Sequence, residues 1–337
     1  MESEGRKGRR ARYAGQKAEQ EAGPPIEGPP APVEAVARLG EPFTGYLAAP
    51  DREETLNEEL GGDVVRHGRL LLAPGPPRDV AWALNVWRDP RRIPFVSIRD
   101  AARRLKGLQR SWAGYPLHMH RRAALISEGL PHVSARPLRF PDPAPIAPLG
   151  SWTLLDRHTI LASPTCSNPF PNGEVRFEED RESPPSRAYL KLWEVFTLVG
   201  VRPGPGERCL DLGASPGGWT WVLQSLGARV IAVDKAPLEP RISSLPGVEE
   251  RRGSAFALDP AAVGSVDWLL SDMACYPSKL LGLVRRWLDA GAARRAVCTL
   301  KFQGETDHDT ARAFAAIPGS RLLHLHNNRH ELTWVKI

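Results

Sequence analysis

The stretch from Cys209 to Trp219 places a short apolar strand directly before a glycine-rich turn and the start of a helix. Glycine at positions 213, 217 and 218 lets backbone N–H groups approach a ligand where a Cβ would obstruct it. A strand, a glycine turn and a helix in this order are typical of an open parallel sheet covered by helices. The remaining chain is therefore expected to supply further strand and helix pairs.

A second apolar strand, Arg229 to Asp234, follows the glycine turn and ends in an acid. A carboxylate at this place can accept hydrogen bonds from both hydroxyls of a ribose. A tight turn without any ligand is the ordinary alternative for an isolated glycine pair. The longer motif with an acid at the expected distance favours a nucleoside site.

The residues around the first glycine distinguish between possible nucleosides. Dinucleotide sites have the spacing Gly-x-Gly-x-x-Gly and bind a pyrophosphate at a helix N-terminus. Here Asp211 precedes the first glycine and Pro216 lies inside the turn. A carboxylate repels a pyrophosphate but suits the amino group and sulfonium of S-adenosylmethionine. The motif therefore favours a methyltransferase over a dehydrogenase.

Composition is that of an ordinary globular protein, and 337 residues leave room for about two domains. No apolar run approaches the roughly 18 residues that span a bilayer, and we expect neither a secretory signal nor a membrane partner.

The four cysteines lack Cys-x-x-Cys spacing, which predicts inert thiols in a reducing cytoplasm. A net charge of +6 favours a polyanionic partner.

Residues 1–41 are rich in arginine and then in proline, with almost no bulky apolar side chains. Such a segment cannot bury enough surface to offset its loss of entropy. We predict a disordered tail. Its basic residues either touch RNA phosphates or are simply solvated, and the sequence leaves both open.

Residues 42–150 are predicted to form a small α+β domain. Strands at 43–48 and 69–73 with a helix at 53–60 between them indicate the opening of a ferredoxin-like unit. A further helix is expected at 98–108, with apolar residues on one face and basic residues on the other.

Two tryptophans, Trp87 and Trp112, are interleaved with this basic region. Basic side chains attract phosphates, and exposed aromatic rings stack on unpaired bases, so RNA binding is favoured. The alternative is that the tryptophans are core residues and the arginines a solvated face. His118 and His120 have no convincing third ligand nearby, and we predict no metal site.

Residues 151–337 are predicted to form the methyltransferase domain. A hairpin at 152–161 and a long loop precede a helix at 186–196 that is capped by Ser186. The remainder alternates strands and helices and closes with an antiparallel hairpin. The expected strands are 207–213, 229–234, 247–252, 265–271, 295–301, 320–326 and 331–336, and the expected helices are 217–227, 277–290 and 307–316. A mostly parallel seven-stranded sheet with this last hairpin is the Rossmann-like class I methyltransferase fold.

Four ionisable residues are expected at the ligand-binding edge of this sheet, since catalytic groups collect at the carboxyl ends of parallel strands. Asp272 follows the fourth strand, Lys301 ends the fifth, and Glu331 opens the last. Lys191 lies on the helix before the first strand. Individually each residue has an ordinary explanation as a solvated strand end or a turn residue.

Taken together, several motifs resemble those of the FtsJ-type ribose 2′-O-methyltransferases. They are Ser186-Arg-Ala-x-x-Lys191-Leu, Asp211-Leu-Gly-x-x-Pro-Gly-Gly-Trp219, Ser271-Asp272-Met273, Leu300-Lys301 and Glu331. Within that family the chain is most similar to the bacterial RlmM branch, which methylates a cytidine ribose of large-subunit ribosomal RNA. The resemblance covers residues 160–337, and residues 42–145 match only as a shortened counterpart of that branch's ferredoxin-like and THUMP RNA-binding region.

The resemblance implies a tetrad of Lys191, Asp272, Lys301 and Glu331, with Lys301 as the general base for a ribose hydroxyl. Removal from water and a second ammonium nearby both disfavour the charged form of a lysine. Asp272 and Glu331 would orient the lysines. The resemblance also implies cofactor contacts from Asp211, Gly213, Ala214, Pro216, Gly217, Gly218, Trp219, Asp234 and Asp272. Near the adenine the family commonly has an acid, where this chain has Ser254.

The sequence thus predicts a cytoplasmic enzyme that methylates a ribose 2′-hydroxyl of RNA, most simply ribosomal RNA, with S-adenosyl-L-methionine as donor. We expect no obligate protein partner. Two alternatives stay open. One is a non-catalytic RNA-binding protein on the same scaffold, and the other is a methyltransferase that acts on a base nitrogen.

Overall fold

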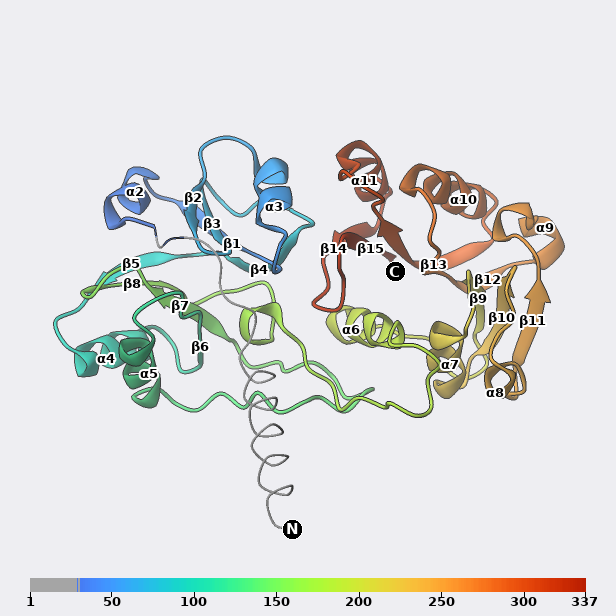
Figure 1. Cartoon of the computed structure of the whole chain (residues 1–337), viewed down its shortest axis with the longest axis horizontal. Coiled ribbons are helices and arrows are strands. Elements are labelled where there is room, and N and C mark those ends of the chain that lie inside the picture. The colour runs from blue at the N-terminus through green and yellow to red at the C-terminus, as the bar shows by residue number, and fades with distance from the viewer. Residues whose placement is uncertain (1–28, 30) are drawn as a thin grey trace, which may run out of the picture.

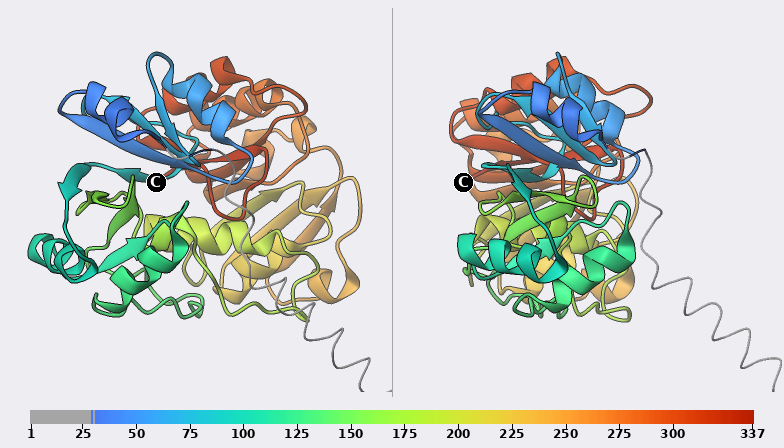
Figure 2. Two further views of the ribbon diagram at one scale, coloured as in Figure 1. Left: turned by 60° about the vertical axis from the view of Figure 1, so that its left-hand side comes forward. Right: turned by 90° about the vertical axis from the view of Figure 1, so that its left-hand side faces the viewer.

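The computed structural model describes residue 29 and residues 31–337, which form two four-stranded sheets and one seven-stranded sheet (Figure 1). The smaller sheets make up the N-terminal half, drawn in blue and green, and the large sheet makes up the C-terminal half. The views in Figure 2 show the blue sheet packed beside the red end of the large sheet, and one buried apolar cluster contains residues of both. The two halves therefore share part of their core.

The first sheet has the strand order β2-β3-β1-β4. In chain order its elements are β1 (Phe43–Ala48), α3 (Glu53–Leu60), β2 (Val65–His67), β3 (Leu70–Pro74) and β4 (Ala83–Trp87). Strand β3 lies between β1 and β2 and is antiparallel to both. The ferredoxin-like strand order is thus present, but the expectation that 69–73 is the strand directly after the helix is wrong. Strand β2 directly follows the helix instead. Its three residues are too few to show the alternation of apolar and polar side chains that identifies a strand.

Helix α2 (Val33–Arg38) lies in the segment predicted to be a disordered tail. Ala31 and Val36 are buried, in a cluster that also contains Leu47 and Trp87 of the first sheet. For residues 31–41 the prediction of disorder is wrong, because these few apolar residues find partners far along the chain. The basic residues near the N-terminus lie outside the described residues.

The second sheet has the order β5-β8-β7-β6. Its elements are β5 (Arg91–Pro94), α4 (Ile98–Leu108), β6 (Trp112–Gly114), α5 (His120–Glu128), β7 (Gly150–Leu154) and β8 (Thr159–Ser163). Helix α4 has the predicted bounds and is capped by Ser97 Oγ, which accepts from Asp100 N at 3.2 Å. The hairpin expected at 152–161 is present as β7 and β8, but it pairs with β5 and β6. We therefore propose that the N-terminal half ends after Ser163 rather than at residue 150.

Both tryptophans of the basic region are core residues. Trp87 is fully buried, and Trp112 is 5% exposed with its Nε1 donating to Leu105 O at 3.0 Å. Neither ring is available to stack on a base. The alternative in which the tryptophans pack in the interior is therefore the correct one.

The third sheet has the order β11-β10-β9-β12-β13-β15-β14. Its strands are β9 (Arg208–Leu212), β10 (Arg229–Asp234), β11 (Val248–Arg252), β12 (Val266–Ser271), β13 (Ala293–Lys301), β14 (Ser320–Leu323) and β15 (Glu331–Lys336). Strands β9 to β13 pair in parallel, whereas β15 is antiparallel to β13 and β14. The predicted Rossmann-like sheet with a terminal antiparallel hairpin is confirmed.

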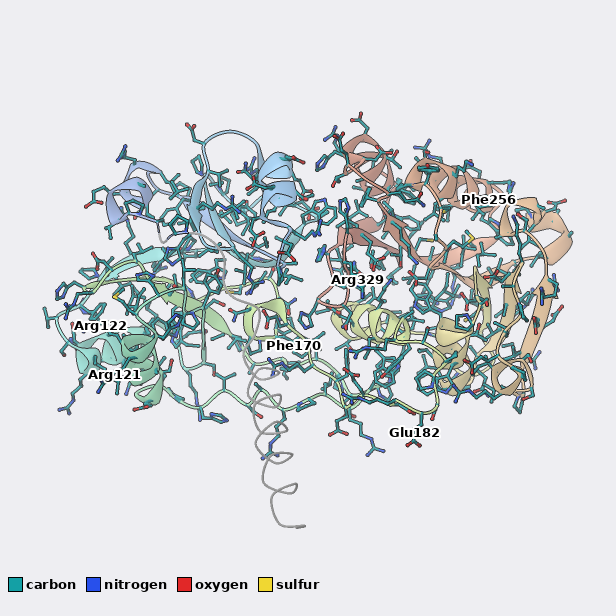
Figure 3. All side chains as sticks on the ribbon, in the orientation of Figure 1. Arg121, Arg122, Phe170, Glu182, Phe256 and Arg329 are labelled. Atoms are coloured by element: carbon teal, nitrogen blue, oxygen red, sulfur yellow. The ribbon has the colours of Figure 1, made fainter. Side chains whose placement is uncertain are left out.

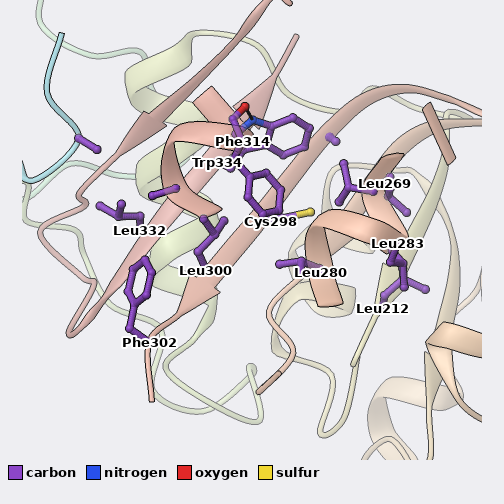
Figure 4. Close-up of a cluster of buried hydrophobic side chains, with 14 of the residues drawn as sticks. Leu212, Leu269, Leu280, Leu283, Cys298, Leu300, Phe302, Phe314, Leu332 and Trp334 are labelled. Carbon is purple, nitrogen blue, oxygen red and sulfur yellow. Dashed lines mark hydrogen bonds between the residues drawn. The ribbon is translucent and has the colours of Figure 1, made fainter. Parts of the chain in front are cut away.

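Helices cover both faces of this sheet. One face carries α6 (Tyr189–Val199), α7 (Gly218–Ser225) and α8 (Pro240–Ser243), and the other carries α9 (Pro260–Val263), α10 (Pro277–Asp289) and α11 (His308–Ala315). Figure 4 shows the second face, where the sheet residues Leu269, Cys298 and Trp334 pack against Leu283 of α10 and Phe314 of α11. Helix α6 begins at Tyr189, and its N-cap is Ala188 rather than the predicted Ser186. Two 3-10 turns complete the elements, η1 (Pro171–Gly173) and η2 (Ala255–Ala257).

All four cysteines are free thiols, and Cys209 and Cys298 are buried in the large sheet. Burial raises the pKa of both thiols, which keeps them protonated. Within the described part of the chain, no helix has the length and apolar character needed to cross a membrane.

Candidate active site

The glycine turn after β9 is built around a buried acid. Asp211 is 1% exposed, and its Oδ2 accepts from Thr220 Oγ1 on α7 at 2.7 Å. Burial raises the pKa of Asp211 to about 7, since the Thr220 hydrogen bond offsets only part of the cost of removing the charge from water. A cation beside this carboxylate would stabilise its ionised form.

Two glycines of the turn are required by neighbouring protein atoms. A Cβ on Gly213 would lie 2.1 Å from Met273 Cγ, and one on Gly217 would lie 2.7 Å from Ile242 Cγ2. Both glycines also have positive φ, at 76° and 116°. From the sequence, we expected glycine at these positions because a ligand needs space beside the backbone. Helix α8 and the loop after β12 also pack directly on the turn, which leaves no space for a larger side chain.

Asp234, at the end of β10, fixes the turn from the other side. Its Oδ2 accepts from Ser215 N at 3.0 Å, and its Oδ1 accepts from Ala236 N at 2.9 Å. Each carboxylate oxygen keeps a second lone pair for a ligand. The acid therefore holds the backbone of the site and can still bind hydroxyl groups.

A cavity of about 520 Å³ opens at this edge of the sheet. Of the residues predicted to contact a cofactor, the lining includes Asp211, Gly213, Ala214, Pro216, Gly218, Trp219, Asp234 and Asp272, and Gly217 alone does not line it. Ser254 lies in the wall as well. The volume is in the usual range for a small-molecule site.

The cavity wall also contains an aromatic residue that was not among the predicted cofactor contacts, Phe256 on η2 (Figure 3). Phe256 is 38% exposed. Together with Met273 it gives the cavity an apolar surface next to the carboxylates. The only feature of the sequence that pointed to Phe256 was its position two residues after Ser254, near the expected adenine site.

The four predicted tetrad residues come together at the cavity. Lys191 Nζ lies 3.0 Å from Asp272 Oδ1 and 2.7 Å from Glu331 Oε1. Lys301 Nζ lies 3.2 Å from the same Asp272 oxygen and also donates to the Asp272 backbone carbonyl. One carboxylate oxygen thus separates the two ammonium groups.

Three strand ends and one helix bring these residues together. Lys301 and Glu331 are opposite each other in the β13–β15 ladder, and Asp272 follows the neighbouring strand β12. Lys191 reaches them from α6. Their side chains are 10% to 26% exposed, and Lys301 is the most exposed of the four. Ion pairs this far removed from water are screened less than surface pairs.

Glu194, one turn after Lys191 on α6, was also missed. It is buried, and its carboxylate accepts from His326 N at 2.6 Å and from Asn327 N and Nδ2 at 3.0 and 2.7 Å. Burial raises the pKa of Glu194 to about 7 against these hydrogen bonds. Glu194 thereby ties the turn before Glu331 to the helix that carries Lys191. In the sequence, the only indication of this role was that Glu194 is a single acid on a mostly apolar helix.

Residues 184–313 match the family described as FtsJ-like methyltransferase, and this range includes the glycine turn and three of the four tetrad residues. The chain contains an FtsJ-like methyltransferase domain. The range also begins after the two small sheets, as the fold suggests.

Two relatives of the chain are both named ribosomal RNA large subunit methyltransferase M. The protein from Halorhodospira halophila is 38% identical over 172 residues, 49% of this chain and 50% of that protein. The protein from Aromatoleum aromaticum is 30% identical over 250 residues, 69% of this chain and 64% of that protein. The chain thus spans about half to two thirds of their lengths. A solved structure, the fibrillarin pre-rRNA processing protein of Methanococcus jannaschii, has 17% identity and a TM-score of 0.32 over 41% of this chain and 69% of that one.

Proposed function

We propose that this chain transfers a methyl group from S-adenosylmethionine to a ribose 2′-hydroxyl of large-subunit ribosomal RNA. The observation that carries the proposal is the cluster of two lysines and two carboxylates beside the cavity. An alcohol needs a base to become a nucleophile, and a lysine with another ammonium close by is suited to that task. The names of the relatives support ribosomal RNA as the substrate, and such a substrate agrees with the cytoplasmic location predicted from the sequence.

The cavity fits the chemistry of S-adenosylmethionine. Asp211 is a buried carboxylate whose ionised form is costly without a nearby cation, and the donor's ammonium and sulfonium provide positive charge. We place the ribose hydroxyls at Asp234 and the adenine between Ser254 and Phe256. When bound, the donor supplies an electrophilic methyl group.

We assign the role of base to Lys301. Lys301 lines the cavity, whereas Lys191 does not. Lys191 contacts oxygens of two carboxylates, Asp272 and Glu331, whereas Lys301 shares a single carboxylate oxygen with Lys191. Lys301 is therefore the lysine of the pair that can meet a substrate in the cavity, and its ammonium has fewer carboxylate oxygens around it.

The other three residues then hold and tune the base. Asp272 fixes Lys301 through both its side chain and its backbone carbonyl. Glu331 neutralises Lys191 and keeps that second ammonium in place. Substrate alcohol approaching Lys301 would thus meet a base that is already oriented.

We further propose that RNA is held at helix α5 of the N-terminal half. Arg121, Arg122 and Arg157 line one open groove there together with His120 and apolar residues, and no acid lines it. Arg121 and Arg122 are labelled in Figure 3. Helix α4 is the weaker candidate, because Asp100 pairs with both Arg103 and Arg104. Uncompensated arginines attract phosphates in a salt-dependent way.

The test uses purified parent protein, Lys301→Ala, Lys191→Ala and the matched control Lys279→Ala. Lys279 is an exposed lysine in the first turn of α10 and lies outside the tetrad. Each protein is given ribosomal RNA from a strain that lacks the gene, with S-adenosylmethionine as donor. Nuclease digestion followed by mass spectrometry then shows whether the methyl group lies on the sugar or on the base.

We expect 2′-O-methyl nucleosides from the parent and from Lys279→Ala, and a loss of at least about 100-fold in rate for both tetrad variants. The variants should retain their fold and donor affinity, measured by circular dichroism and calorimetry. Parent-like rates in both tetrad variants would overturn the mechanism. A methylated base would instead support a base methyltransferase, and no donor binding at all would support a non-catalytic scaffold. Ribose-methylation mapping of RNA from cells with and without the gene identifies the nucleotide.

A further inference from the structure

Trp82, in the connection between β3 and β4, is a tryptophan of the N-terminal half that packs into the methyltransferase half. It is 1% exposed and belongs to the buried cluster that joins the two halves. Its indole lies against three aromatic rings of the C-terminal half. The ring centroids are 5.6 Å away for Phe302, 5.2 Å for His324 and 5.8 Å for His330.

Two of these rings belong to residues that are adjacent in sequence to the tetrad. Phe302 directly follows Lys301, and His330 directly precedes Glu331. Phe302 N donates to His330 O at 3.2 Å, and the two rings are 5.5 Å apart. This contact closes the β13–β15 ladder just beyond the pair formed by Lys301 and Glu331. Trp82 therefore covers the end of the ladder that carries half of the tetrad.

The backbone of Trp82 is itself held firmly. Glu59, on α3, accepts from Ala81 N at 2.8 Å and from Trp82 N at 3.0 Å with its two carboxylate oxygens. Arg78 adds a bond from its Nη1 to Leu60 O at 2.7 Å. The indole is thus a fixed support that extends from the first sheet.

We propose that Trp82 is a positioning residue for methyl transfer, which sets the geometry of Lys301 and Glu331 through Phe302 and His330. The inference rests on the proposed function, because it concerns the same tetrad. It gives the N-terminal half a second role besides holding RNA. In this role the first sheet completes the active site without touching the substrate.

The physical reason lies in how closely the tetrad is spaced. Its contacts are 2.7 to 3.2 Å long, so a shift of one strand end breaks the ion pairs. Strand β13 ends at Lys301 and strand β15 begins at Glu331, and neither the segment after Lys301 nor the one before Glu331 continues the sheet. Without the indole, Phe302 and His330 gain space to move. A displacement of about 1 Å at reacting groups can lower a rate by about 100-fold.

The test compares Trp82→Leu, Trp82→Phe and Phe302→Leu with the matched control Trp87→Leu. Trp87 is a fully buried tryptophan of the same sheet, but its apolar cluster contains only residues of the N-terminal half. The measurements are kcat and KM for RNA, donor affinity by calorimetry, and melting temperature. The double variant Trp82→Leu/Phe302→Leu shows whether the two residues act through one contact.

We expect Trp82→Leu and Phe302→Leu each to lower kcat by about 10- to 100-fold with little change in KM or donor affinity. Trp82→Phe should restore kcat to within about threefold, since an aromatic ring still fills the space. The double variant should lose no more than the worse single variant. Trp87→Leu should lower the melting temperature and leave kcat at 25 °C near the parent value.

Parent-like kcat in folded Trp82→Leu, or an equal loss of kcat in Trp87→Leu, would overturn the inference. If Trp82→Leu does not fold, parent-like kcat in Phe302→Leu overturns it and a loss of kcat supports it. These outcomes are distinct from failure of the proposed function, in which the parent protein itself would place no methyl group on ribose.

Discussion

Replacing Asp211 by asparagine should stabilise the protein at pH 8 and strongly weaken donor binding. Asp211 is fully buried, and its pKa is raised from 3.8 to about 7. The unfolded chain releases this proton near pH 4, whereas the folded protein holds it up to about pH 7. Between these values the folded state binds more protons than the unfolded state, so the stability of the parent falls as the pH rises.

The size of the effect follows from the two pKa values. A difference of about 3 units corresponds to about 4 kcal/mol at full ionisation, of which about 3 kcal/mol develops between pH 5 and pH 8. Asparagine carries no ionisable proton and still offers an oxygen to Thr220 Oγ1, which now donates to Asp211. The variant should therefore lack this part of the pH dependence.

Urea unfolding of parent and variant, without donor, at pH 5 and pH 8 measures this difference directly. Comparing the two pH values within each protein cancels the cost of the substitution itself. Calorimetry measures donor affinity, which should fall by at least about 100-fold because a charge-assisted contact is lost. Asp234→Asn is the control, since it should weaken donor binding through a lost ribose contact without stabilising the protein. Equal pH dependence in parent and Asp211→Asn would refute the reasoning.

Three further predictions concern other parts of the molecule. Gly213→Ala should destabilise the protein by about 1 to 3 kcal/mol in urea unfolding and weaken donor binding, because position 213 has a positive φ and the new Cβ would collide with Met273. Unchanged stability would contradict the close packing of Met273 on Gly213. Arg121→Ala/Arg157→Ala should raise KM for RNA and flatten its salt dependence while kcat stays constant, whereas an unchanged salt slope would remove the α5 groove as the RNA surface. Burial lowers the pKa of His324 from 6.5 to about 4, so stability should fall by about 3 kcal/mol as the pH drops through that window, and His324→Gln should lose this dependence.

Local sequence patterns predicted the methyltransferase half closely. The central strands of the large sheet, such as β9, β10 and β12, are short runs of mostly apolar residues bounded by turn residues, and the long helices show an apolar face. The glycine turn was informative because positive φ and close packing leave few alternatives to glycine. The predicted tetrad could be found because strand ends at one edge of a parallel sheet meet in space.

The N-terminal half was predicted less well, since its structure depends on pairing between distant segments. Strand β2 has three residues and no period of its own, and α2 has a single buried side chain, Val36. The hairpin of β7 and β8 was predicted as a hairpin, but its pairing with β5 and β6 was not. Nothing in residues 150–163 records that β5 and β6 are its partners.

The sequence by itself determined which residues could perform the chemistry, because strand ends, glycine turns and acid spacing are local properties. Only the tertiary structure decided how they act together. It placed one Asp272 oxygen between the two ammonium groups, buried Asp211 and Glu194, and brought Trp82 against the ends of β13 and β15. Distances, burial and contacts between halves come from segments far apart in the chain, and no local pattern specifies them.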